Sequence, residues 1–253
     1  KSGVEVAGRG ILHLSVLMET MRREGFEFQV GTPKVLFKTV NGVKMEPIED
    51  AAVETPSEYA GKVIEVFGFN GGTMVDMSTY GDRTTLRFEI PTRGVMGLRT
   101  KVLNVSHGEA IFSHRFSKYG PVAGNVTGRK NGVMVAMATD KAVAYALDTL
   151  QQRGTMFVEP GDECYEGMIV GECAKEGDMD VNVSKTKQLG NQRSSTADKA
   201  ILLTPPVTFT LEEALEYIQE DELVEVTPKS IRLRKRTLDK IGRKKERARA
   251  MGK

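Results

Sequence analysis

Cysteine is scarce in this sequence, and Cys164 and Cys173 are the only two thiols among 253 residues. A disulfide framework needs more cysteines than this, and neither has a histidine nearby to complete a zinc site. No stretch approaches the roughly 18 apolar residues that a membrane-spanning helix requires. The chain starts with Lys1-Ser2-Gly3 and lacks the apolar segment of a secretory signal. We therefore expect a protein of the reducing cytoplasm, without a metal site or membrane contact.

Motifs for nucleotide binding and catalysis are also missing. The segment Ala60-Gly61-Lys62-Val63 lacks the first glycine and the hydroxyl residue of a P-loop, and Gly8-Arg9-Gly10 lacks the third glycine of a dinucleotide fingerprint. The only histidines, His13, His107 and His114, show no spacing typical of a nucleophile–base pair or a metal site. No catalytic residue is predicted. A hydrolase or transferase site that uses His107 or His114 is kept as an alternative.

Charge is distributed unevenly along the chain. The segment 229–253 holds twelve of the 36 Lys and Arg residues but only two of the 34 Asp and Glu residues. A basic tail on a mildly acidic body indicates an anionic partner, most often a nucleic acid. A disordered, solubilising tail is one alternative interpretation. Another is a protein-only adaptor whose acidic body binds a basic partner.

A polar stretch without carboxylates lies between two segments of β-strand character, 179–183 and 200–203. It is centred on residues 190–195, Gly-Asn-Gln-Arg-Ser-Ser, and Lys185 and Lys187 precede it. Such donors suit contact with phosphate and ribose, because ammonium and guanidinium groups pair with anionic oxygens. The alternative is a plain solvated loop, since loops are commonly polar.

The first 120 residues show the periodicities of two small α+β units. A helix over 11–25, with Leu14, Leu17, Met18 and Met21 at helical spacing, precedes strands over 26–30 and 35–39. We expect this first unit to lack its opening elements. The second unit has the order βαββαβ of a ferredoxin-like split βαβ fold. Its elements are predicted over 45–53, 56–68, 73–77, 84–90, 95–105 and 110–116.

After Gly120-Pro121 short strands dominate, with helices over 142–153 and 210–218. Thr210 and Glu213 match a capping box at the start of the second helix. The predicted fold class is α+β and multidomain: partial and complete ferredoxin-like split βαβ sandwiches, then a β-rich C-terminal domain with helices. The predicted boundaries are 1–44, 45–120 and 121–238, followed by a basic tail, 239–253, that is helical or loose. The strands of the third part are predicted over 131–137, 155–158, 165–173, 179–183, 200–203, 224–226 and 230–234.

Four sequence motifs resemble translational GTPases of the elongation factor G type, and specifically the BipA/TypA subfamily. They cover residues 8–25, 91–99, 165–171 and 221–236. The last, Asp-Glu-Leu-Val-Glu-Val-Thr-Pro-Lys-Ser-Ile-Arg-Leu-Arg-Lys-Arg, is the most specific. Ile11 departs from the family, which usually has Glu there, and the basic tail is longer than the family leads us to expect.

The resemblance implies part of domain III, a domain V and a C-terminal domain peculiar to the subfamily. It implies no enzymatic activity and no cofactor for this chain, because GTP and Mg²⁺ are expected in a GTPase domain that the sequence lacks. The full protein is expected to bind ribosomes in a GTP-dependent way and to support large-subunit assembly and growth under stress or cold. Expected partners are the 50S and 70S ribosome, rRNA and tRNA near the aminoacyl site, bound by a cytoplasmic monomer.

The resemblance also implies that the polar stretch is an RNA-contacting finger and that the end of the last motif adds to it. Recognition would depend on RNA shape more than on base sequence. The predicted RNA-binding residues are Lys185, Lys187, Gln188, Asn191, Gln192, Arg193, Arg232, Arg234, Lys235 and Arg236.

Overall fold

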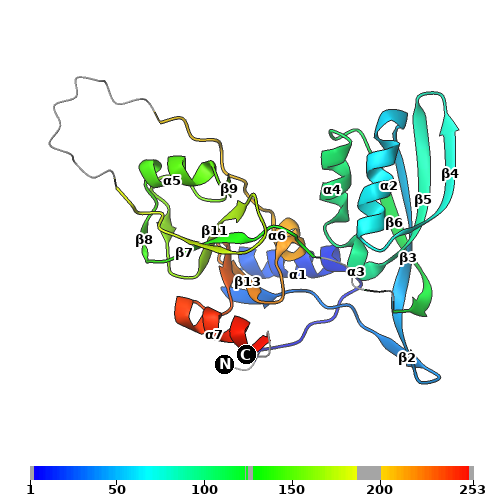
Figure 1. Cartoon of the computed structure of the whole chain (residues 1–253). Helices are drawn as coiled ribbons and strands as arrows, with labels where there is room; N and C mark the ends of the chain where they lie inside the picture. Colours follow the sequence, from blue (N-terminus) through cyan, green and yellow to red (C-terminus); the bar gives the residue numbers. More distant parts are fainter. Residues whose placement is uncertain (1–2, 123, 125–127, 187–200, 251–253) are drawn as a thin grey trace. The chain divides into compact units, whose positions relative to one another are not determined.

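The computed structural model describes residues 3–122, 124, 128–186 and 201–250 (Figure 1). Contacts divide the chain into two compact units: unit 1 comprises residues 1–32 and 129–253, and unit 2 comprises residues 33–128. The first 32 residues are thus grouped with the C-terminal half of the chain. The four-part division made from the sequence stays a prediction. None of the helices in the described ranges combines the length and apolar character needed to cross a membrane.

Unit 1 is built on a seven-stranded mixed sheet. Six strands follow in the order β1-β13-β14-β11-β7-β12, and β9 pairs with β11. All pairs are antiparallel except β12 with β7. A separate two-stranded ladder joins β8 and β10. The strands are β1 (Phe28–Gly31), β7 (Val133–Ala136), β8 (Asp140–Lys141), β9 (Gly154–Met156), β10 (Glu163–Cys164), β11 (Met168–Cys173), β12 (Met179–Val181), β13 (Glu222–Val226) and β14 (Ile231–Lys235).

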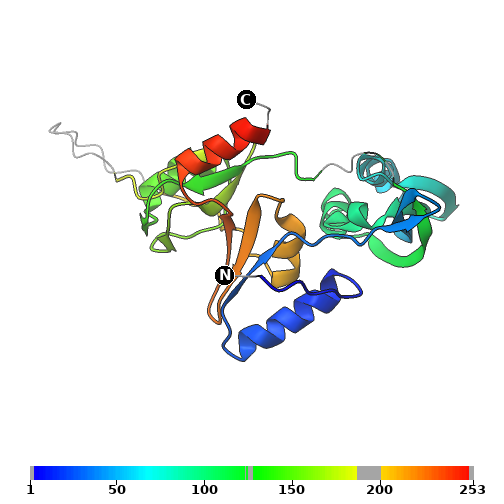
Figure 2. The same ribbon diagram turned by 90° about the horizontal axis from the view of Figure 1, so that it is seen from below.

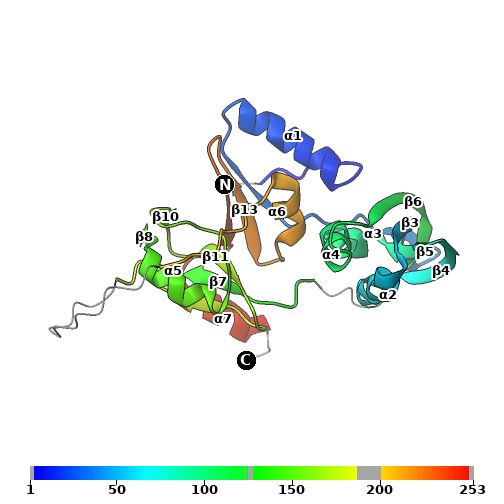
Figure 3. The same cartoon turned by 90° about the horizontal axis from the view of Figure 1, so that it is seen from above.

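Helices cover both faces of this sheet, so β7 is buried on both sides. Met134 packs in one apolar cluster with Leu147 of α5 (Ala144–Gln151). Its neighbour Val135 packs in another with Leu215 of α6 (Leu211–Tyr217). In Figures 2 and 3, α1 (Ile11–Arg23) and α6 lie beside β13. Thr210 and Glu213 form the predicted capping box, which is confirmed.

Helix α1 half-buries three of the four residues of its predicted stripe, Leu14, Met18 and Met21. Ile11 and Met18 pack against the α6 cluster, and Ser15 between them is buried. Leu17, predicted to lie on the buried side, is 45% exposed. The helix itself is confirmed, and it ends before Gly25, whose φ of +92° suits glycine at that position.

Unit 2 confirms the ferredoxin-like expectation. Its sheet has the order β4-β5-β3-β6, and a hairpin adds β2 to the start of β3. Buried residues such as Val53, Leu86 and Phe88 pack against Phe67 and Val102 of the helices. The elements are β2 (Lys38–Val40), β3 (Val43–Pro56), η1 (Ser57–Tyr59), α2 (Ala60–Phe69), β4 (Thr73–Tyr80), β5 (Arg83–Pro91), α3 (Thr92–Val95), α4 (Leu98–Val105) and β6 (Ile111–Pro121).

Two predicted elements differ in the structure. The single helix predicted over 95–105 is divided into α3 and α4, because Met96 is extended and Gly97 has φ of +70°. The strand predicted over 200–203 is wrong for residues 201–203, which form no strand; residue 200 lies outside the described ranges. The Gln151 amide binds the Leu202 carbonyl and the Thr204 N–H instead, each at 2.9 Å, so a side chain satisfies backbone groups that a sheet would otherwise pair.

Candidate nucleic-acid interface

The predicted polar finger lies largely outside the described part of the chain. Lys185 is described and exposed, a few residues after β12. The other five predicted contacts there lie outside the described residues and stay predictions: Lys187, Gln188, Asn191, Gln192 and Arg193.

Strand β14 separates the basic residues of the last motif by side-chain direction. Ile231 and Leu233 pack into the α6 cluster, so the alternation of a strand places Arg232 and Arg234 on the opposite face. Both arginines are half-buried, and Arg236 is exposed. Among the described residues, these three arginines have no ion pair with a carboxylate. They are therefore cations without a carboxylate partner, and Arg234 donates to the backbone carbonyls of Lys235 and Arg236.

The carboxylate opposite Arg232 has other partners. Glu225, paired in register with Arg232, accepts a hydrogen bond from the Tyr165 hydroxyl at 2.7 Å and one from the Gln29 amide at 3.4 Å. Burial and this hydrogen bond to Glu225 both raise the pKa of Tyr165, so the hydroxyl keeps its proton and remains a donor. Glu225 therefore has hydrogen-bond partners other than Arg232.

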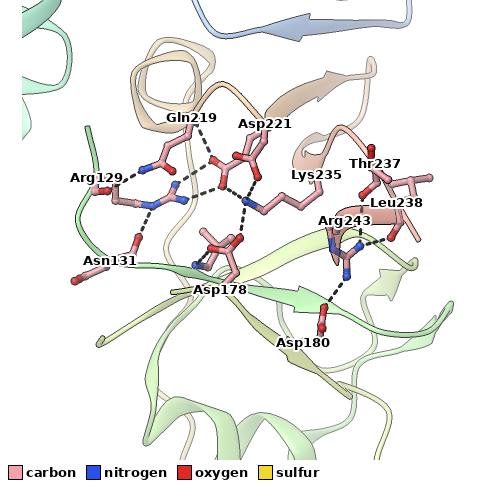
Figure 4. Close-up of polar contacts among 12 residues, drawn as sticks. Arg129, Asn131, Asp178, Asp180, Gln219, Asp221, Lys235, Thr237, Leu238 and Arg243 are labelled. Atoms are coloured by element: carbon pink, nitrogen blue, oxygen red, sulfur yellow. Dashed lines mark hydrogen bonds and ion pairs between the residues drawn. The ribbon is translucent and has the colours of Figure 1, made fainter. Parts of the chain in front are cut away.

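Lys235 is a correction to the predicted set. It lies on the same side of β14 as Leu233, its side chain is only 2% exposed, and its ammonium contacts three carboxylates (Figure 4). Its Nζ lies 2.8 Å from Asp178 and 2.9 Å from both Asp221 and Glu222. Burial alone would lower the pKa of Lys235, but these carboxylates outweigh it and raise that pKa. We remove Lys235 from the proposed contact set, because its ammonium cannot reach a phosphate.

The same buried cluster fixes the strands beneath the arginines. Glu222, with no exposed side-chain surface, accepts two hydrogen bonds from Arg129 at 2.8 and 3.1 Å as well as the bond from Lys235. Burial would raise the pKa of Glu222, but the two cations lower it. The Arg129 guanidinium also lies 4.5 Å from the centre of the Tyr217 ring. The cluster therefore joins β13, β14 and the ends of two loops, and holds β14 in place.

The basic tail forms a docked helix, α7 (Lys240–Ala250), which is the first of the two predicted states, helical or loose. Arg243 is 7% exposed and binds Asp180 of β12 at 2.6 Å, and it also donates to the Leu238 carbonyl (Figure 4). Figure 1 shows α5 and α7 on opposite sides of β7. Lys244, Lys245 and Arg249 are exposed on α7. One arginine thus anchors the helix while other cations remain in solvent.

A cleft of about 840 Å³ lies beside Arg232, between α1, the start of β14 and segment 207–212. Its charged lining consists of Arg22, Arg23, Lys229 and Arg232, against Glu19 and Glu212. Hydrogen bonds from Arg22, and then from Arg23, lower the pKa of Glu19 to about 2. The prediction from sequence missed Arg22 and Arg23, because only the tertiary fold brings α1 next to β14.

Family comparisons cover most of the two units. Residues 43–130 match the family model described as "Elongation factor G C-terminus", and residues 131–240 match "TypA/BipA C-terminal domain". Residues 131–240 thus carry a C-terminal domain of the TypA/BipA family, next to a C-terminal domain of the elongation factor G type at residues 43–130. The TypA/BipA match ends at residue 240, so nearly all of α7 lies beyond it.

Individual proteins with BipA or TypA in their names are also similar to this chain. The chain is 48% identical over 242 residues to the Bacillus subtilis "Large ribosomal subunit assembly factor BipA", covering 95% of this chain and 40% of that protein. It is 48% identical over 231 residues to the protein of the same name from Synechocystis, covering 91% and 39%. It is 47% identical over 230 residues to the Arabidopsis thaliana "Putative elongation factor TypA-like SVR3, chloroplastic", covering 90% and 34%. The chain thus spans about two-fifths or less of the length of these relatives.

The histidines considered as catalytic alternatives, His107 and His114, lie in the part that matches the elongation factor G C-terminus and have structural contacts there. His114 Nδ1 lies 2.5 Å from a Glu49 carboxylate oxygen, and its ring stacks on Phe112. His107 meets the Tyr59 ring edge-on. Burial raises the pKa of the Cys164 thiol to about 11, which makes it a poor nucleophile at neutral pH. In the described ranges no three His, Cys, Asp or Glu residues are grouped to hold a metal ion.

Proposed function

We propose that this chain is the ribosome-binding region of a large ribosomal subunit assembly factor and that it acts by contacting rRNA. The observation that carries the proposal is the set of arginines Arg232, Arg234 and Arg236, which have no ion pair among the described residues and stand on and just after a strand fixed by a buried charge cluster. The names of the relatives support the ribosomal setting. The exposed cations of α7 extend the same surface chemistry, whereas the cleft cations Arg22 and Arg23 are both paired with Glu19.

The proposed mechanism is binding. Guanidinium groups pair with phosphate oxygens, and a rigid β14 fixes the spacing of these pairs on the RNA backbone. Contacts of this kind recognise the shape of folded RNA and its 2′-hydroxyls more than its base sequence. The polar finger would add contacts to rRNA or to tRNA near the aminoacyl site. GTP and Mg²⁺ would bind in a GTPase domain elsewhere in the longer protein, which would make ribosome binding GTP-dependent and support translation under stress or cold. We further propose a cytoplasmic monomer.

Changing Arg232, Arg234 and Arg236 together to Gln is expected to weaken ribosome binding. Each lost phosphate contact removes about 0.7 to 0.9 from the slope of log affinity against log salt, so the triple variant is expected to lose about 2 to 3 from that slope. The measurement is sedimentation with purified 50S subunits and 70S ribosomes over a series of salt concentrations, supported by affinity for an rRNA transcript.

A matched control removes three exposed cations of unit 2, through Lys62→Gln, Arg87→Gln and Arg99→Gln. It changes the net charge equally and is expected to bind nearly as the wild type does. Equal behaviour of the two triple variants, or binding that is independent of salt, would contradict the proposal. A third variant, Lys185, Lys187 and Arg193 to Ala, measures the share of the polar finger. Competition by free RNA separates this function from a protein-only adaptor, whose binding RNA would not displace.

A further inference from the structure

Unit 2 carries a second group of cations and aromatic rings that the proposed interface does not use. The hairpin of β2 and the first residues of β3 extends beyond the end of β5, because β5 pairs with β3 only from Ile48 onward. Figure 1 shows this hairpin projecting past the part of the sheet that α2 and α4 cover. Its turn is Asn41-Gly42, with φ of +50° and +78°, as a tight two-residue hairpin requires.

Rings and lysines meet at the base of this hairpin. The Lys38 ammonium lies 4.1 Å from the centre of the Tyr119 ring, and the Tyr119 ring meets the Phe116 ring edge-on at 5.5 Å. Phe116 is 57% exposed, which is unusual for a phenylalanine on a paired strand. We call Lys38, Phe116 and Tyr119 the aromatic corner. Phe37, 41% exposed, has the Lys44 ammonium 4.1 Å from its ring centre.

The local charge favours an anionic partner. Segment 33–45 contains three exposed lysines, Lys34, Lys38 and Lys44, and no Asp or Glu. Two carboxylates on the neighbouring strands are already paired with cations: Glu89 binds Lys118 at 2.7 Å, and the buried Glu46 binds Arg93 at 2.5 Å. Glu49, which is in register with Phe116, contacts His114 at 2.5 Å. An exposed ring near a lysine can stack on a base while the ammonium group holds a flanking phosphate. A duplex offers no free base face for such stacking.

We propose that the aromatic corner binds unpaired nucleotides of RNA, with one base stacked on Phe116 and an adjoining phosphate held by Lys38. Tyr119 supports the Phe116 ring and orients the Lys38 ammonium. This site is in unit 2 and is distinct from the arginines of β14. It needs single-stranded RNA, whereas the arginines contact phosphates of any folded RNA.

The chain has no tryptophan, which allows a direct test. Phe116→Trp keeps a stacking ring and introduces a single indole fluorophore into the full chain. Titration with a 12-nucleotide oligouridylate is expected to quench this fluorescence, because base stacking brings the base onto the indole. Heparin, a polyanion without bases, and a 12-base-pair RNA duplex are expected to leave it nearly unchanged. The matched reporter is Tyr80→Trp, at a position 94% exposed on β4 of the same unit, where no quenching is expected.

Affinity gives the second readout. Phe116→Ala is expected to weaken oligouridylate binding roughly 5- to 150-fold, the usual range for loss of one stacked base, whereas Tyr80→Ala is expected to have no effect. Lys38→Gln is expected to lower the salt slope by about 0.7. Phe116 is exposed, so its replacement is not expected to disturb folding, and an unchanged circular dichroism spectrum checks this.

Three results with the Phe116→Trp variant would overturn the proposal: no quenching of its indole by the oligonucleotide, equal quenching by heparin, or quenching only by intact ribosomes and not by naked RNA. The last would point to a protein partner. The titration is repeated with Arg232, Arg234 and Arg236 changed to Gln. Quenching is expected to persist there, so failure of the β14 interface and failure of the aromatic corner are separate outcomes.

Discussion

Lys235→Met is expected to destabilise unit 1 by about 3–5 kcal/mol, the cost of removing one partner from a buried ion pair. The change leaves Glu222 with no exposed side-chain surface and with only Arg129 as its cation, and it removes the cation that Asp178 and Asp221 share. Met has a similar volume, so the effect measures lost charge pairing more than a cavity.

Hydrogen exchange measures the stability of unit 1 separately from that of unit 2. Amides of β13 and β14 that exchange by unfolding of the unit are expected to lose protection roughly 150- to 5,000-fold, the equivalent of that free energy. Amides of β3 and β5 in unit 2 act as an internal control. Arg236→Met, one residue further along and exposed, is expected to change stability by less than about 0.5 kcal/mol while lowering RNA affinity. Similar protection in the Lys235 and Arg236 variants would contradict a structural role for Lys235.

The same cluster predicts how the stability of unit 1 depends on pH. The folded pKa of Glu222 lies below its ordinary value of 4.5, so its stabilising contribution is complete above about pH 4.5 and is lost as pH falls through the folded pKa. The folded pKa of Lys235 lies above 10.5, so its contribution is complete below that pH and is lost as pH rises through the folded pKa. Urea midpoints between pH 3 and 7 are expected to fall more steeply with acid in the wild type than in Glu222→Gln.

Arg93→Met is expected to have a comparable effect on unit 2. Glu46 has no exposed side-chain surface, and the Arg93 guanidinium binds it in a bidentate manner at 2.5 and 3.1 Å. Arg93 is 25% exposed at its side chain, which places the expected loss near the lower end, about 3 kcal/mol. Loss of amide protection in β3, β5 and β6, with no change in β13 and β14, is the expected result.

Two further variants test whether the unpaired Glu46 carboxylate causes the loss of stability in Arg93→Met. Arg99→Met on α4 removes an exposed arginine six residues away and is expected to be nearly neutral. The double variant Glu46→Gln with Arg93→Met removes both charges and is expected to recover part of the stability, because a buried amide costs less than a buried carboxylate. A double variant no more stable than Arg93→Met would show that the loss comes from packing and not from the unpaired charge.

The sequence predicts local features of this fold better than the partners of its strands. The capping box of α6 follows from two residues three apart, and the βαββαβ order of unit 2 follows from alternating apolar residues. Strand β1 was predicted as well, but its pairing with β13 was not, because a periodic pattern does not indicate which strand lies beside it. The division of the 95–105 helix at Met96 and Gly97 also depends on tertiary packing.

Lys235 shows where the prediction of the site was incomplete. In the run Arg-Leu-Arg-Lys-Arg it resembles its neighbours, and charge alone places it among the RNA contacts. Its position at i+2 from Leu233 and i+4 from Ile231 puts it on the apolar face of β14, a signal that was available in the sequence. Its partner Glu222 occupies the matching position of β13. By contrast, nothing in the sequence brings Arg22 and Arg23 next to Arg232.

The pairing of β1 with β13 constrains how the chain is made. Phe28 is opposite Val226, so β1 leaves the ribosome about 200 residues before the strand that completes its hydrogen bonds. At typical synthesis rates this gap lasts about 10 to 40 s. All of unit 2 is translated between β1 and β13 and is able to fold first. During this time the apolar side chains of Phe28 and Val30 remain uncovered in the nascent chain. A strand translated about 200 residues after β1 thus completes the hydrogen bonds of β1.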